Sequence, residues 1–368
     1  MITCVAVAIN ERIDFFIIEI SKKYGLSIEK CREIYLKIDI ERTGSRERSG
    51  SPANFTSIDF PHKNIRLGLC CINTILRKHK PPVFCSRNLI KRTWTLEKAK
   101  TLALQNITDI GKMIDWNCDN RISLLRISSD IFPRFTDRNT VGNFTIDFAK
   151  PLLTKIGKKI KETNHRILMH PGQYNQVGAV KQTVFDSTII DLSHHADILD
   201  ALGTDPKSSV IIIHGGGTYG NKKETISRWI SQYKLLPEKI KVRLALENCE
   251  RGYSVKDCLY ICEELKMRMI FDSHHYSCYN ILNPQEYISE SELIKLFPRI
   301  IATWKGEIPI MHISEQGEGR IGHHSDYIQE IPSYFFRLGN IDIEVEAKAK
   351  EQAIFKLYEK YGRENFRV

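Results

Sequence analysis

Potential metal ligands recur at the carboxyl ends of short apolar segments throughout this sequence. The candidates are His170, His214, Glu247, Asp272, His275, His312, His324 and Glu346. A single histidine or acid in such a place usually makes a structural hydrogen bond or caps a helix. Six successive apolar segments, however, end in a residue of this kind. Because imidazole and carboxylate groups together bind divalent ions, the pattern favours a metal cluster.

Five histidines and three carboxylates are more ligands than one ion needs. We therefore expect two or three divalent ions, with a carboxylate such as Glu247 positioned to bridge them. A nitrogen and oxygen ligand set without thiolates suits manganese or zinc. Such ions clamp phosphates and generate hydroxide from bound water near neutral pH. The residues expected to act in catalysis are Glu247, His170, His214, Asp272 and Glu346.

Two short motifs follow the first two histidines. His214 is followed by three glycines, as in the oxyanion loop of lipases, but the sequence lacks the G-x-S-x-G motif of a serine nucleophile. The glycines instead suggest close approach of the backbone to a metal or a phosphate. His170 is followed by Pro-Gly and then by Gln173 and Tyr174, which we expect at the rim of the site. Tyr174 is either a plain surface aromatic or a wedge for a base stack.

The segments that carry these residues predict a (β/α)8 barrel. Their Ile, Val and Leu content is typical of parallel strands that are covered on both faces. The predicted strands are Ile65–Leu69, Ile122–Ser128, Arg166–His170, Val210–His214, Val242–Glu247, Met267–Asp272, Pro309–His312 and Ile341–Glu346. Helical patterns between them include Leu96–Ile114, Ile146–Lys161, Thr183–Leu202, Lys222–Gln232 and Val255–Leu265. The carboxyl ends of barrel strands meet at one mouth, where barrel enzymes have their active sites. An open doubly wound sheet is the alternative, but the G-x-G-x-x-G motif is absent after the first strand.

Residues 1–60 differ from the rest and are interpreted as an N-terminal extension, with the barrel domain at 61–368. A helix is expected at residues 27–37, followed by a Ser-, Gly- and Arg-rich linker at 43–53. The net charge is +10, and because the charges of residues 1–60 cancel, the excess lies in the barrel domain. This basic balance suits a polyanion such as nucleic acid, although a lysine-rich solvated surface is the plainer explanation.

Cysteine spacing and hydropathy predict the environment of the chain. Ten cysteines without a C-x-x-C pair suggest an intracellular, reducing compartment, in the cytoplasm or nucleus. No apolar run approaches the roughly 20 residues of a membrane span. Acidic Glu11 interrupts the apolar N-terminus, so neither a secretion signal nor a membrane partner is expected. We also expect a monomer.

The order of eight motifs resembles the UV damage endonuclease family over Ile65 to Gln352. These motifs are R-L-G-L-C-C-I-N at Arg66–Asn73, R-I-S-S-D-I-F-P at Arg126–Pro133, M-H-P-G-Q-Y at Met169–Tyr174, I-H-G-G-G at Ile213–Gly217, A-L-E-N at Ala245–Asn248, F-D-S-H-H at Phe271–His275, M-H-I-S at Met311–Ser314 and V-E-A-K at Val345–Lys348. The resemblance implies a TIM barrel similar to endonuclease IV with a trinuclear, manganese-containing site. It also implies nicking of double-stranded DNA immediately 5′ to cyclobutane dimers and 6-4 photoproducts, leaving 3′-hydroxyl and 5′-phosphate ends.

By motif position, the resemblance assigns metal binding to the same eight residues that the strand ends select. It further implies that Gln173 and Tyr174 probe the damaged bases and that Asn73 lies near the lesion. Two positions depart from the family pattern: Leu69 stands where a tyrosine is common, and Ile310 where many members have a lysine that helps to bind metal. Alternatives are an abasic-site endonuclease, a metal-dependent sugar isomerase on the same barrel, and a damage-binding protein without catalysis.

Overall fold

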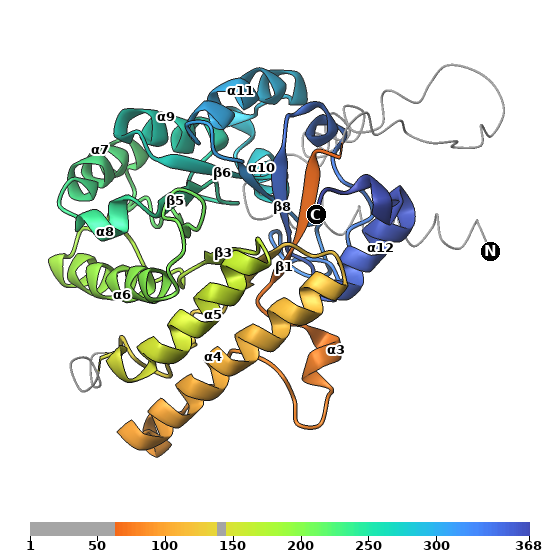
Figure 1. Ribbon diagram of the computed structural model, residues 1–368. Helices are drawn as coiled ribbons and strands as arrows, with labels where there is room; N and C mark the ends of the chain where they lie inside the picture. The colour runs from red at the N-terminus through yellow and green to blue at the C-terminus, as the bar shows by residue number, and fades with distance from the viewer. Residues whose placement is uncertain (1–62, 138–144) are drawn as a thin grey trace.

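Eight parallel strands close into a barrel in chain order, each paired with its sequence neighbours and β1 with β8 (Figure 1). This computed structural model describes residues 63–137 and 145–368. The strands are β1 (Ile65–Cys70), β2 (Leu124–Ile127), β3 (Arg166–Met169), β4 (Ile211–His214), β5 (Leu244–Glu247), β6 (Arg268–Asp272), β7 (Ile310–Ile313) and β8 (Ile341–Val345). The predicted barrel is confirmed, and each strand lies within two residues of its predicted bounds.

Helices surround the barrel and pack their apolar faces against the strands. They are α3 (Thr74–Arg77), α4 (Leu96–Asp119), α5 (Lys150–Glu162), α6 (Gln182–Ala201), α7 (Lys222–Tyr233), α8 (Glu238–Lys241), α9 (Val255–Leu265), α10 (Ser273–Leu282), α11 (Glu290–Ala302) and α12 (Glu351–Tyr361). The five predicted helices are confirmed as α4, α5, α6, α7 and α9. The long helices α4 and α5 lie side by side (Figure 1). The predicted extension, with its helix at 27–37, lies outside the described residues.

Alternate side chains of each strand point into the barrel and form layers along its axis. The middle layer is apolar and consists of Leu124, Leu168, Ile212, Ala245, Ile270 and Ile310, with Trp304 packed against it. Gly68 of β1 belongs to the same level, where a Cβ atom would lie 2.1 Å from Cδ2 of Leu124. A larger residue at this position would therefore displace the side chain of Leu124, its partner on β2.

A buried charge cluster closes the amino-terminal end of the barrel. Asp342 of β8 is fully buried and accepts two hydrogen bonds from Arg66, at 2.7 and 2.6 Å. Arg166 and Arg367 also donate to it, at 2.7 and 2.8 Å. Charged groups in such a place require partners, and these arginines provide them. This end of the barrel is thus filled, and the opposite end is left for a site.

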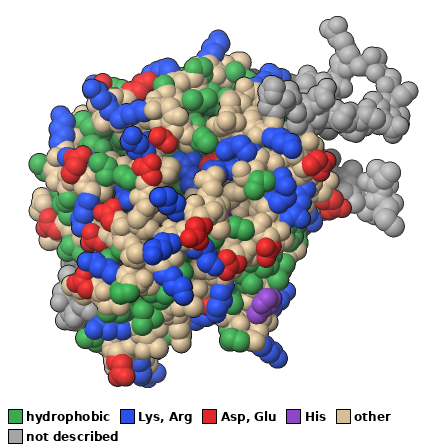
Figure 2. All heavy atoms as spheres, in the orientation of Figure 1, with side chains coloured by type: hydrophobic (Ala, Val, Ile, Leu, Met, Phe, Trp, Pro, Cys, Tyr) green, Lys and Arg blue, Asp and Glu red, His purple; other side chains and the backbone are tan. Residues whose placement is uncertain are grey.

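The surface charges and the hydropathy of the helices bear on two interpretations, a single basic DNA-binding patch and a membrane-spanning helix. On the face shown in Figure 2, lysine and arginine side chains are interspersed with aspartate and glutamate. The charge excess therefore does not mark one DNA-binding patch on that face. Within residues 63–137 and 145–368, no helix combines the length and hydropathy required to cross a bilayer.

Candidate metal centre

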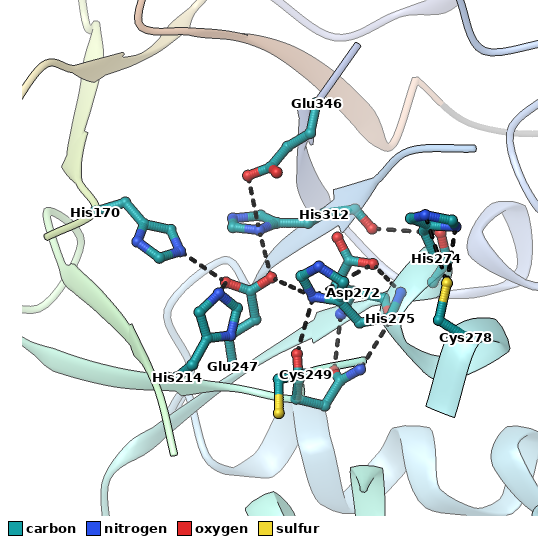
Figure 3. Close-up of polar contacts among 12 residues, drawn as sticks. His170, His214, Glu247, Cys249, Asp272, His274, His275, Cys278, His312 and Glu346 are labelled. Atoms are coloured by element: carbon teal, nitrogen blue, oxygen red, sulfur yellow. Dashed lines mark hydrogen bonds and ion pairs between the residues drawn. The ribbon is translucent and has the colours of Figure 1, made fainter. Parts of the chain in front are cut away.

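The carboxylate of Glu247 lies at the centre of the polar layer that fills the carboxyl end of the barrel (Figure 3). Glu247 ends β5 and is fully buried. Its Oε2 atom lies 3.1 Å from Nε2 of His170 and 3.8 Å from Nε2 of His214. Its Oε1 atom lies 3.1 Å from Nδ1 of both His275 and His312. Each oxygen of Glu247 thus faces a different pair of histidines.

The other predicted ligands surround this carboxylate. Glu346 follows β8, and its oxygens lie 3.4 Å from Nδ1 of His312 and 3.8 Å from Nδ1 of His324. His324 comes from the loop after β7 and stands at the edge of the group. The structure therefore brings together all eight predicted metal ligands. His170 and Glu346 lie one residue beyond their strands, and the other strand-end residues lie within them.

Asp272 has two tasks at the end of β6. Its Oδ1 atom accepts a 2.6 Å hydrogen bond from the backbone N–H of His275 and so caps α10. Its Oδ2 atom is buried and has no hydrogen-bond partner among the described residues. The cap turns the chain so that His275 faces Glu247, whereas His274 faces Cys278, with its ring nitrogens 3.5–3.6 Å from Sγ. The F-D-S-H-H motif therefore supplies one histidine to the centre and one to the packing beside it.

The charges of the centre match the requirements of divalent ions. Burial opposes the charged form of His312, yet Glu247 and Glu344 outweigh it and raise the pKa of this imidazole well above its ordinary value. Burial likewise opposes a charged His275, but Asp272 and Glu247 raise its pKa. A divalent ion would neutralise these carboxylates in place of the protons on the imidazoles. The deprotonated ring nitrogens would then be available as ligands. Burial lowers the pKa of His214 to about 4, so this imidazole is already in the neutral form that metals bind.

Two groups of three residues could each hold an ion, and they share Glu247. The first is His170, His214 and Glu247, and the second is Glu247, Asp272 and His312. The ligand atoms within each group all lie within 4.8 Å of one another. Together with the orphaned Oδ2 atom of Asp272, this arrangement fits divalent metal ions.

Three residues of the same layer were missed from the sequence: Cys70, Arg126 and Glu344. Glu344 is fully buried, and its Oε2 atom lies 3.0 Å from Nε2 of His312. The Nε atom of Arg126 lies 2.9 Å from Glu344, and its terminal nitrogens contact Glu346 and Cys70. Two-residue periodicity could have revealed Glu344, because it shares a strand face with Glu346.

A hollow of about 320 Å³ opens above the metal centre. It is lined by Cys71, Arg126, His170, Pro171, Gly172, Gln173, His214, Glu250, His275, Arg320, Ile321, Gly322, His323, His324 and Glu346. The hollow is thus continuous with the proposed ligands, and Arg320 adds positive charge to its wall. Gly215, which follows His214, packs closely against Tyr253. A Cβ atom at position 215 would lie 2.4 Å from the tyrosine ring, so a larger residue would clash there.

Gln173 and Tyr174 are exposed beside this hollow, at the rim position expected for them. The side chain of Tyr174 is 63% exposed, and its ring lies over Gly172, where a Cβ atom would come within 2.4 Å of it. Partial burial and nearby Asp191 raise the pKa of Tyr174 to about 12, so its hydroxyl remains protonated at neutral pH.

A sequence profile described as UV-endonuclease UvdE matches residues 65–366. The chain belongs to this family of endonucleases. The UV-damage endonuclease of Schizosaccharomyces pombe is 38% identical over 315 residues, which cover 82% of this chain but 51% of that protein. The putative UV-damage endonuclease of Acanthamoeba polyphaga mimivirus is 37% identical over 82% of this chain and 95% of that protein. The chain thus spans about half the length of the first relative and nearly all of the second.

A solved UV-endonuclease has the same fold. The crystal structure of SacUVDE superposes with a TM-score of 0.73 at 29% identity, over 82% of this chain and 100% of that one. The family and the fold are therefore established independently of the metal centre.

Three positions that the family resemblance singled out are buried. Asn73 is fully buried, and its side-chain oxygen accepts a 2.8 Å hydrogen bond from the backbone N–H of Leu76. The side chain of Asn73 thus caps α3, and its expected position near the lesion stays a prediction. Leu69 packs in the core between barrel and helices, and Ile310 lies in the apolar layer below the metal centre.

Proposed function

We propose that this chain is a metal-dependent DNA repair endonuclease that nicks the backbone immediately 5′ to UV photoproducts, leaving 3′-hydroxyl and 5′-phosphate ends. The observation that carries this proposal is the buried Glu247, whose two oxygens face two different pairs of histidines. A bridging carboxylate in this position is typical of centres that cleave phosphate esters with two or more ions. Membership of the UV-endonuclease family supports the damaged-DNA substrate.

The chain's own residues would hold the ions and orient the phosphate. His170 and His214 with Glu247 would hold one ion, and Asp272 and His312 with Glu247 would hold another. Bound ions supply Lewis-acid stabilisation of the phosphate and an activated water.

The surrounding residues would orient these ligands and the substrate. Arg126 keeps Glu346 turned toward the centre, and Arg320 offers positive charge to the DNA backbone at the rim. Gln173 and Tyr174 would enter the distorted duplex, because photodimers are poorly stacked and cost little to extrude.

The remaining expectations belong to this proposal. Manganese is the expected metal, and zinc suits the same ligands. UV-damaged double-stranded DNA is the partner, with the protein acting as a monomer. The eight cysteines of the described residues are all free thiols, which supports an intracellular, reducing compartment.

The substitution Glu247→Gln tests the proposal, because it removes the bridging charge and keeps the volume. We expect it to abolish nicking of an oligonucleotide that carries one cyclobutane dimer, while binding of the same duplex remains. The matched control is Glu359→Gln, at an exposed position of α12. Nicking by Glu247→Gln at saturating manganese would refute the assignment of the centre.

The same assay separates the alternative activities. Duplexes with a 6-4 photoproduct or an abasic site, run beside the dimer, distinguish a photoproduct enzyme from an abasic-site endonuclease. Binding without nicking by the wild-type protein in any metal would instead indicate a damage-binding protein. Ketose isomerisation without nicking would indicate a sugar isomerase.

A further inference from the structure

Asp191 is a buried acid in the middle of α6, and it faces loops at the barrel mouth. Its exposed fraction is 3%. A buried carboxylate is costly unless hydrogen bonds satisfy it, so its partners indicate what it stabilises. Its hydrogen-bond partners come from the loops after β2 and β3, and His195 of α6 lies 3.6 Å from its Oδ2 atom. None of these residues is a proposed metal ligand.

The carboxylate of Asp191 joins the two loops. Its Oδ1 atom accepts a 2.6 Å hydrogen bond from the hydroxyl of Thr136, in the loop after β2. Its Oδ2 atom accepts a 2.8 Å hydrogen bond from Nδ2 of Asn175, in the loop after β3. The hydroxyl of Tyr174 also reaches Oδ1 at 3.5 Å.

Asn175 closes the turn that carries Gln173 and Tyr174. Its Nδ2 atom donates to the carbonyl of Gly172 at 3.1 Å as well as to Asp191, and its own backbone N–H donates to the same carbonyl. One residue further on, the backbone N–H of Gln176 donates to the hydroxyl of Thr188 on α6 at 3.0 Å. The helix thus holds the base of the turn at two points, and the turn's exposed side chains project from there.

We propose that Asp191 is a positioning residue for damage recognition, which holds the Gln173–Tyr174 turn in the orientation that meets a distorted duplex. The proposal rests on the proposed function, in which this pair enters the DNA. Asp191 itself is buried and is not one of the proposed metal ligands. A turn that is fixed beforehand binds more tightly, because less freedom is lost when the complex forms.

The substitution Asp191→Asn tests this role, since it removes the negative charge that Thr136, Tyr174 and Asn175 share and replaces one acceptor oxygen by a donor. We expect affinity for duplex with one cyclobutane dimer to fall roughly tenfold, the effect of a few side chains that must be ordered on binding. Affinity for undamaged duplex should stay the same, because phosphate contacts dominate it. Manganese content should also stay the same. The matched control is Asp186→Asn, on the exposed face of α6, where the side chain contacts Gln182.

A double-mutant cycle separates positioning from general destabilisation. In a protein that already carries Gln173→Ala and Tyr174→Ala, Asp191→Asn should cause no further loss of affinity for damaged duplex. If Asp191→Asn does not fold, Asn175→Ala removes the same link and keeps the acid, and the same results are expected of it.

Three outcomes would overturn the proposal. The first is that the wild-type protein prefers damaged duplex and the Asp191 or Asn175 variant shows the same ratio of affinities for damaged and undamaged duplex. This result would leave the proposed function intact. The second is additive losses in the cycle, which would show a structural role. The third is wild-type protein without any preference for damaged duplex, which would overturn the proposed function as well.

Discussion

A substitution of Glu344 tests how a residue behind the proposed ligands controls the metal affinity of the centre. Its Oε2 atom faces Nε2 of His312 at 3.0 Å, and the other ring nitrogen, Nδ1, faces Glu247 at 3.1 Å. A carboxylate that accepts the Nε2–H hydrogen leaves the Nδ1 lone pair for a metal. On its other side, Glu344 lies 2.9 Å from Nε of Arg126. Glu344 thus lies between a guanidinium, which can only donate, and an imidazole nitrogen that donates in the metal-binding tautomer.

The substitution Glu344→Gln creates a conflict in either orientation of the new amide. If its NH2 group faces Arg126, two donors meet. If it faces His312, the imidazole must accept at Nε2 and carry its hydrogen on Nδ1, which blocks the metal-facing nitrogen. Loss of such a partner typically lowers metal affinity about 10- to 100-fold. This corresponds to roughly 1.4–2.7 kcal/mol.

Competition between the protein and a chelator for manganese measures this change directly. We expect weaker manganese binding by Glu344→Gln and recovery of nicking at saturating manganese, because Glu344 is fully buried behind His312. Glu359→Gln serves as the control, and a thermal melt checks the fold. An unchanged manganese Kd would refute the tautomer argument, and nicking that stays lost at saturating metal would show a different role for Glu344.

Two further predictions concern stability and domain organisation. Asp342→Asn should cost about 3–5 kcal/mol at neutral pH, because it leaves Arg66 and Arg166 buried without their counter-charge. Burial opposes the charge of Asp342, but these arginines hold its pKa below the ordinary value, so its stabilisation is lost as the pH falls. The difference in free energy of unfolding between wild type and Asp342→Asn, measured with denaturant, should therefore become smaller below about pH 4. A difference that persists there would contradict this assignment. A chain that begins at Pro61 should fold and nick irradiated DNA, since all eight strands lie from Ile65 onward; an insoluble or inactive product would place residues 1–60 within the catalytic domain.

The barrel could be predicted because each strand is an almost uninterrupted apolar run that ends abruptly. Helices α10 and α11 were harder to predict, for identifiable reasons. In α10, polar residues such as His274 and Asn280 are buried, so the usual contrast between apolar and polar faces is lost. Helix α11 contains Pro298, which normally argues against a helix interior.

Six of the eight proposed metal ligands could be predicted because they end strands, whereas the contacts of their supporting residues could not. Arg126 and Glu344 lie within strands, where a charged residue on its own gives no indication of what it faces. Only the closed barrel shows that β2 and β8 bring them to the level of Glu346 and His312. Similarly, nothing in the sequence indicates that α6 turns Asp191 toward the mouth. These interactions depend on tertiary contacts between distant segments.

The number of metal ions can be predicted from the groups of ligands in the polar layer around Glu247. Among the described residues, a third possible group consists of Cys70, Glu344 and Glu346, but Arg126 contacts all three and already supplies their positive charge. Ile310 contributes no ligand atom, and His324 stands at the edge of the centre, 3.8 Å from Glu346 and with its ring centroid 6.4 Å from that of His275. We therefore predict two ions per chain, bridged by Glu247. Elemental analysis of protein purified in manganese should give this ratio, with a lower ratio in Glu247→Gln, whereas three tightly held ions per wild-type chain would contradict the prediction.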